Sequence, residues 1–134
     1  TDDFNGARQD GVGLYQVTQF HGEKQGQRCS AAAAYLHPIE ENRANLTIIT
    51  KAHAQRIIIE DQQARGVVYE KEGKEYRIYA NGEVILSSGA FGSPQLLMLS
   101  GIGPANHLRK LGIDVVRDIP AVGENLQDHI DLIL

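Results

Sequence analysis

The sequence of 134 residues contains no tryptophan and a single cysteine, Cys29. A lone cysteine cannot form a disulfide within the chain, and no spacing of Cys and His is typical of a structural zinc site. We therefore expect no metal site. The cysteine count also favours a reducing compartment, and the expected location is cytoplasmic or peripheral to the inner membrane rather than secreted.

Long apolar runs are missing as well, since no stretch approaches the roughly 20 residues that a membrane helix needs. Positive charge is scarce: 13 Lys and Arg stand against 17 Asp and Glu, for a net charge of -4. Without a cluster of basic side chains, the chain has no stripe of charge for phosphates. Neither an integral membrane segment nor a nucleic-acid partner is expected. The length and the 42% of hydrophobic residues indicate one globular domain.

The distribution of β-branched and aromatic residues predicts an α+β fold. Short β-favouring runs joined by tight polar turns between residues 55 and 80 predict a three-stranded antiparallel meander. Adjacent apolar residues in 83–88 are typical of a strand that is buried on both faces. The additional strands are expected near residues 12–20, 46–50, 83–88 and 113–117, and short helices near 31–36, 94–100 and 105–111.

Motifs for catalysis are few. The complete glycine-rich phosphate loop GxGxxG is absent, and so is the GxSxG elbow of serine hydrolases. Residues 89–94, GAFGSP, place small residues between a strand and a helix, where a backbone can approach a ligand closely. A purely structural strand-to-helix turn would have the same sequence. Asp128 beside His129 is typical of a capped loop rather than a catalytic pair.

The run from Gly89 to Pro104, GAFGSPQLLMLSGIGP, closely resembles the second signature of the glucose-methanol-choline (GMC) family of FAD-dependent oxidoreductases. Further blocks follow the family order, so the resemblance covers essentially the whole chain. Within the family the chain looks most like the bacterial choline and alcohol dehydrogenase branch. The blocks include residues 3–6, 11–18, 28–36, 45–48, 65–67, 83–90 and 122–129.

The resemblance implies that residues 1–134 are a central fragment of a GMC FAD-binding domain. Family members are several times longer, begin with a βαβ phosphate loop and end with a catalytic histidine region, and neither is in this sequence. The implied parent enzyme oxidises the CH–OH group of an alcohol such as choline by hydride transfer to FAD. We expect no catalytic residue in this chain and no activity from it alone.

The resemblance also implies cofactor contacts, residue by residue. Ala54 stands where the family commonly has a valine whose backbone holds the adenine end of FAD. Ser88, Gly89 and Ala90 match the strand end near the dinucleotide, with Ser88 in place of the usual alanine. The remaining implied contacts are Asn125, Asp128 and His129 near the flavin, and Asn5 and Gly6 near the substrate cavity.

The alternative hypothesis is a freestanding α+β binding or interaction module without redox activity. The two hypotheses differ in the surface that they predict, because a piece of a larger enzyme exposes apolar side chains that its missing partners would cover. A fragment would also self-associate through that surface.

Overall fold

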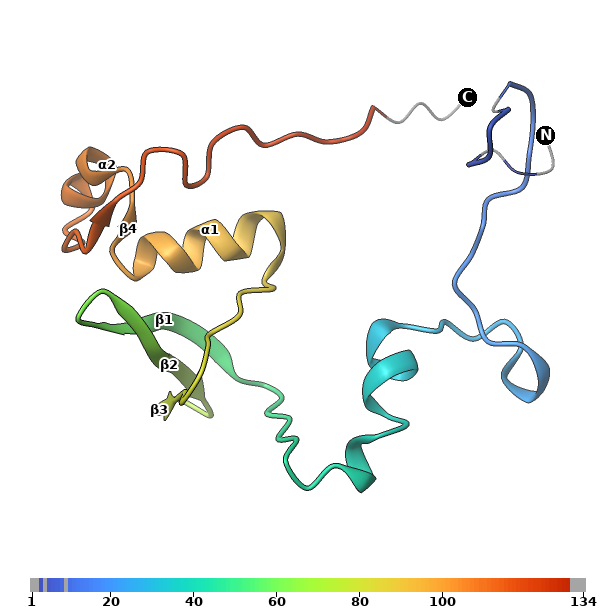
Figure 1. Cartoon of the computed structure of the whole chain (residues 1–134), viewed down its shortest axis with the longest axis horizontal. Helices are drawn as coiled ribbons and strands as arrows, with labels where there is room; N and C mark the ends of the chain where they lie inside the picture. The colour runs from blue at the N-terminus through green and yellow to red at the C-terminus, as the bar shows by residue number, and fades with distance from the viewer. Residues whose placement is uncertain (1–2, 4, 9, 131–134) are drawn as a thin grey trace. The chain divides into compact units, whose positions relative to one another are not determined.

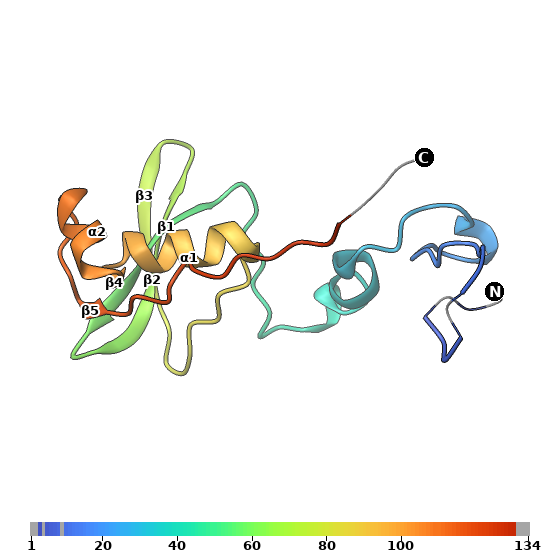
Figure 2. The ribbon, with the colours of Figure 1, turned by 90° about the horizontal axis from the view of Figure 1, so that it is seen from above.

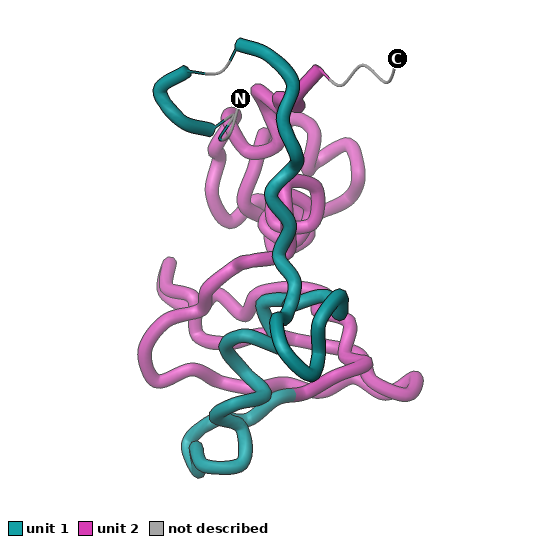
Figure 3. The backbone as a smooth tube through the Cα atoms, turned by 90° about the vertical axis from the view of Figure 1, so that its right-hand side faces the viewer, with its two compact units in different colours: residues 1–48 teal, residues 49–134 magenta. Residues whose placement is uncertain are grey.

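The computed structural model describes residues 3, 5–8 and 10–130 (Figure 1). The chain divides into two compact units, residues 1–48 and 49–134, which Figure 3 shows in different colours. Each unit has its own set of internal contacts.

The first unit contains three short helical turns, η1 (Gly22–Lys24), η2 (Ala32–Leu36) and η3 (Glu40–Asn42). The second turn, η2, coincides with the helix that the alanine run predicts near 31–36, and it has π-helical geometry. The hydroxyl of Ser30 accepts a hydrogen bond from the N–H of Ala33 at 3.2 Å. A serine side chain therefore satisfies one of the free donors at the start of this turn.

The strand expected near residues 12–20 does not form. Within this range only Gln19 makes a β-bridge, an isolated one with Arg28, and Leu14 is 93% exposed. Residues 46–50 form no strand either. Both predictions were wrong because β propensity reflects packing against neighbouring strands, and the described residues offer none to these segments.

The second unit is built on the predicted meander, and this prediction is confirmed. The strands β1 (His53–Glu60), β2 (Gln63–Lys71) and β3 (Lys74–Tyr79) pair antiparallel in the order β1-β2-β3. Residues 61 and 62 both have positive φ, and so do residues 72 and 73. Two-residue loops of this kind suit the right-handed twist of the strands that they join.

Helix α1 (Gly89–Leu99) packs along β1 (Figure 2). Leu96 of the helix and Ile57 of β1 are both buried, as is Val68 of the central strand at 1% exposure. The helix begins five residues before the start expected at Pro94. Gly89 has φ +82, and the hydroxyl of Ser93 accepts a hydrogen bond from the N–H of Ser88 at 3.0 Å. The residues of the expected loop thus form the first turn of the helix.

A small parallel ribbon and a second helix follow α1. The strands β4 (Ile102–Gly103) and β5 (Arg117–Asp118) pair in parallel on either side of α2 (Ala105–Lys110) in the chain. The helix expected near 105–111 is confirmed, whereas the strand expected near 113–117 contributes only its last residue. The carboxylate of Asp118 accepts a hydrogen bond from the N–H of Ala105 at 2.9 Å, which ties the ribbon to the start of α2.

Residues 83–87 are extended but pair with no other strand among the described residues. Val84 and Leu86 are half-buried, whereas Ile85 is 80% exposed. The expected burial on both faces is therefore wrong for this structure, because only one face of the segment has a neighbour. The α+β fold class is confirmed. No helix of the described residues has the length and apolar character needed to cross a membrane.

Candidate functional site

A cavity of about 340 Å³ lies between the start of β1 and helix α1. Two of the predicted cofactor-binding residues, Ala54 and Ser88, line this cavity although they are far apart in the sequence. The lining residues are Ala52, His53, Ala54, Ser88, Gly92, Gln95, Leu96 and Leu99.

An irregularity in β1 shapes the first wall of this cavity. Ala54 pairs with Tyr69 and Arg56 with Val68, so Gln55 is an extra residue in the β1 strand. A β-bulge of this kind bends the strand and changes the direction of its side chains. The amide of Gln55 donates a hydrogen bond to the carboxylate of Glu70 at 3.2 Å, which holds the bulged residue against β2.

The start of α1 forms the opposite wall. Ser88 precedes the helix, and a Cβ added at Gly92 would lie 2.9 Å from the Cβ of Ser88. Glycine at this position therefore keeps the wall open. The first N–H groups of a helix have no partner within it and carry partial positive charge. Gly89 and Ala90 supply two of these N–H groups.

A second hollow of about 450 Å³ lies on another face of α1. It brings together Ala90 and Asn125, two further residues of the predicted set. Asn125 has φ +57, in the left-handed region that asparagine tolerates better than most residues. The lining residues are Ala90, Phe91, Pro94, Met98, Gly123, Glu124, Asn125, Leu126 and Gln127.

The other predicted residues lie outside these two cavities. Asp128 and His129 are exposed, and the N–H of His129 donates to the Asp128 carboxylate at 2.8 Å, as expected of a capped loop. In the first unit, the side-chain amide of Asn5 donates to the side chain of Gln16 at 3.1 Å. Gly6 donates its N–H to the carbonyl oxygen of Asp3 at 3.1 Å.

Six of the eight lining residues of the first cavity were not among the predicted contacts, and they include His53, Gly92 and Gln95. A signal for two of them was present, because Gly92 and Gln95 fall at helical spacing from Ser88 and so lie on the same side of α1. That signal depends on the helix beginning at Gly89, whereas the sequence predicted a start at Pro94.

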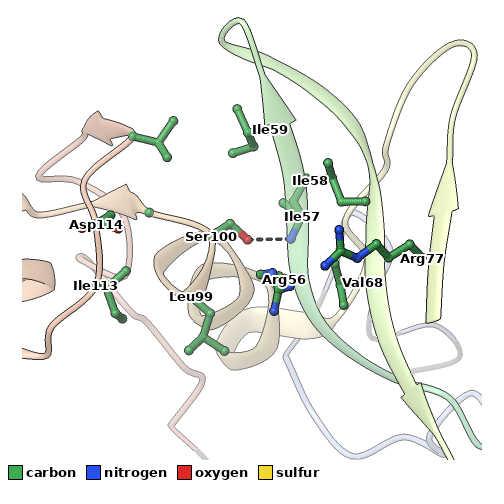
Figure 4. A pocket seen from close by; sticks show the side chains of 12 residues that line it. Arg56, Ile57, Ile58, Ile59, Val68, Arg77, Leu99, Ser100, Ile113 and Asp114 are labelled. Carbon is green, nitrogen blue, oxygen red and sulfur yellow. Dashed lines mark hydrogen bonds between the residues drawn. The ribbon is translucent and has the colours of Figure 1, made fainter. Parts of the chain in front are cut away.

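Ser100, at the end of α1, fixes the helix against β1 (Figure 4). Its hydroxyl accepts a hydrogen bond from the N–H of Ile57 at 2.8 Å and donates one to the carbonyl oxygen of Leu96 at 2.6 Å. Ser100 is 8% exposed and Ile57 is 7% exposed. Since Leu96 also lines the first cavity, this contact helps to set the distance between the cavity's two walls.

Ser100 also lines a third cavity of about 390 Å³, which Figure 4 shows. Arg56 and Arg77 lie on the side of the meander, and Asp114 and Leu99 lie on the opposite side. None of the predicted cofactor-binding residues lines this cavity. Among the described residues, no group of three or more His, Cys, Asp or Glu side chains is placed to hold a metal ion.

A family model described as GMC oxidoreductase matches residues 1–131. The chain belongs to the GMC oxidoreductase family. This confirms the family that the sequence signature resembles.

Two named relatives are similar to nearly the whole of this chain. The chain is 53% identical to alcohol dehydrogenase [acceptor] of Pseudomonas putida, over 98% of this chain and 23% of the relative. It is 51% identical to the mitochondrial choline dehydrogenase of Homo sapiens, over 98% of this chain and 21% of that protein. The chain thus spans less than a quarter of the length of these relatives.

Three solved structures are similar to part of this chain. A crystal structure of pyridoxine 4-oxidase from Mesorbium loti aligns with a TM-score of 0.65 and 37% identity, covering 71% of this chain and 18% of that one. A formate oxidase structure aligns with a TM-score of 0.56 and 43% identity, covering 58% of this chain and 14% of that one. An FAD-dependent oxidoreductase from Chaetomium thermophilum aligns with a TM-score of 0.58 and 36% identity, covering 60% of this chain and 14% of that one.

Proposed function

We propose that this chain forms the adenine-binding part of the FAD site in a GMC enzyme that oxidises the CH–OH group of an alcohol such as choline. The observation that carries the proposal is the cavity between β1 and α1, which joins Ala54 and Ser88. Its volume of about 340 Å³ lies within the range of small-molecule sites, about 300–1,000 Å³.

The residues of the cavity suit an adenine ring. Ala54 and its neighbour Ala52 have small side chains, so a ligand can reach the β1 backbone, and Gly92 leaves the facing wall open. Leu96 and Leu99 offer apolar surface to the faces of a ring. The free N–H groups at the start of α1 would favour negative charge nearby, such as that of a phosphate.

The second hollow, beside Ala90 and Asn125, is the proposed path toward the flavin. We extend the same proposal to Asp128 and His129, which follow Asn125 in the chain. When FAD is bound, its flavin ring accepts the hydride of the alcohol. The role of this chain in that reaction is to bind and orient the dinucleotide, and we assign none of its residues to proton transfer.

Exposed apolar side chains favour this proposal over the freestanding module. Phe91 and Ile85 are largely exposed in the second unit, and Leu14 in the first. Large exposed apolar surfaces are typical of regions that a partner covers. We propose that other parts of a longer protein cover these side chains.

The adenine site can be tested on the chain itself by following backbone NMR shifts during titration with AMP. We expect saturable shifts at Ala54, Ser88 and Gly92, and competition by FAD. The substitution Gly92→Val should abolish them, because its side chain would collide with Ser88 and fill the cavity. The matched control is Gly82→Val, since a Cβ at Gly82 meets no atom within 4 Å. Shifts confined to other residues would contradict the assignment.

The alcohol-oxidising activity is tested in the longer protein that contains this chain. Addition of choline or another alcohol should bleach the visible absorbance of bound FAD, because the flavin becomes reduced. Gly92→Val should lower the bound FAD at least about tenfold, a loss of about 1.4 kcal/mol in binding free energy. Flavin that no alcohol reduces would refute the proposed activity while leaving the adenine site intact.

A further inference from the structure

The outer strand of the meander, β3, has an unused edge. β2 pairs with one side of β3, and no described segment pairs with the other side. All six residues from Lys74 to Tyr79 are exposed. The free N–H and C=O groups of such an edge are a template for another strand.

The hydrogen bonds of the hairpin show which backbone groups of β3 point outward. The N–H of Ala80 donates to the carbonyl oxygen of Arg65 at 2.8 Å, which makes these residues a hydrogen-bonded pair. Such pairs alternate along an antiparallel ladder, so Ile78 and Tyr76 also bond to β2. The N–H and C=O groups of Glu75, Arg77 and Tyr79 therefore point away from the sheet.

This alternation restricts how a second β3 strand can pair. Two identical antiparallel strands are related by a two-fold axis, and hydrogen bonds form only where outward residues face outward residues. An axis at Glu75 would place Glu75 opposite its own copy. An axis at Arg77 would place two arginines opposite each other, and like charges in that position are destabilising.

An axis at Tyr76 satisfies both conditions. Glu75 then faces Arg77 of the second copy, and Arg77 faces the second Glu75, so two opposite-charge pairs form at hydrogen-bonded positions. Tyr76 meets its own copy at a position where side chains come closest. Tyr76 already stacks on Tyr69 with the ring centres 5.4 Å apart, so the aromatic row would continue across the axis.

Within one chain the same charges already form a small group. Glu75 lies 3.4 Å from the guanidinium of Arg77 and 3.6 Å from that of Arg56, and these side chains are about half-exposed. Exposed ion pairs contribute little to the stability of a fold. Charges across an interface instead select the partner and its alignment, because mismatched arrangements are repelled.

We propose that the free edge of β3 pairs with β3 of a second copy of this chain, with Glu75 opposite Arg77, to form a continuous six-stranded sheet. The proposal does not depend on FAD binding, since the edge is outside both cavities of the proposed cofactor site. A single strand pair buries less surface than a standard stable interface, so the dimer is weak and depends on concentration.

Charge reversal tests this register by sedimentation equilibrium, from about 10 μM to about 1 mM protein. The chain should shift from one copy to two over this range. Glu75→Arg and Arg77→Glu should each remain monomeric, because each places like charges opposite each other. An equimolar mixture of the two variants should form a mixed dimer, and the double variant E75R/R77E should dimerise again. Lys110→Glu, on α2, is the control and should behave as the unchanged chain.

Amide hydrogen exchange of the unchanged chain gives a test without variants. Raising the concentration should slow the exchange of Glu75 and Arg77 at least about threefold, and that of Tyr76, which already bonds to β2, should not change. A chain that stays monomeric throughout, single variants that dimerise normally, or no mixed dimer would each overturn the proposal. So would concentration-dependent protection located at residues 83–87 instead of β3.

Discussion

Removal of the Ser100 hydroxyl is the most direct test of how α1 is held against the meander. The substitution Ser100→Ala deletes one oxygen atom at a buried position and keeps the helix-forming backbone. It removes two hydrogen bonds, one from the N–H of Ile57 and one to the carbonyl oxygen of Leu96. The loss in free energy of unfolding depends on whether each of these two backbone groups keeps another hydrogen-bond partner.

The carbonyl oxygen of Leu96 keeps a partner, because the backbone N–H of residue 100 also donates to it at 3.2 Å. The N–H of Ile57 loses its hydrogen bond to Ser100 at a residue that is 7% exposed. A buried donor left without a partner costs about 1–3 kcal/mol. We therefore expect the free energy of unfolding to fall by about 2 kcal/mol, a midpoint shift of roughly 1 M in urea.

Urea unfolding followed by circular dichroism measures this change. Ser93→Ala in the same helix is the matched control, because Ser93 accepts a hydrogen bond from the exposed N–H of Ser88. Water can replace that bond, so the control should lose no more than about 0.5 kcal/mol. Equal losses for the two variants would refute the reasoning, since burial of the Ile57 N–H would then have no effect.

Two further substitutions test the packing of the second unit by the same unfolding measurement. Gly66→Ala should destabilise the meander by more than about 3 kcal/mol, because a Cβ in the central strand would collide with the carbonyl oxygen of Ile78, whereas Gly82→Ala should change little. A small effect at position 66 would mean that β2 and β3 can separate at no cost. Asp118→Ala should lower the free energy of unfolding by about 1–2 kcal/mol, because the N–H of Ala105 loses its hydrogen bond. Asp118→Asn should retain most of that stability, since its side-chain oxygen can still accept the bond. Equal losses for the two variants would contradict the capping role of Asp118.

The local pattern predicted well those elements whose partners are close in the sequence. The meander strands are joined by two-residue loops, so alternation of apolar residues and polar turns was sufficient to predict them. The helix near 105–111 was also predicted, because Pro104 and Gly112 bracket it in the sequence.

Elements that depend on distant partners were predicted poorly. Residues 12–20 and 83–87 have strand-like sequences, but a strand forms only when another strand supplies hydrogen bonds. Helix α1 begins before Pro94 because Gly89 and Ser93 provide a turn that the sequence prediction assigned to a loop. The prediction placed Pro94 in the first turn of the helix, whereas in the structure Pro94 lies inside α1, beyond the turn that begins at Gly89.

The sequence by itself determined the family and the residues to search for a cofactor, since a long ordered signature requires no coordinates. It also determined the meander, whose contacts are local. Only the tertiary structure decided that Ala54 and Ser88 line one cavity, because their separation depends on how α1 packs on β1. Asp128 and His129 line neither this cavity nor the hollow beside Ala90 and Asn125. The same packing, which the hydrogen bonds of Ser100 fix, also places His53, Gly92 and Gln95 in the cavity between β1 and α1. The pairing of β3 with β2 likewise decides which backbone N–H and C=O groups of β3 point away from the sheet. The sequence of β3 alone does not specify this.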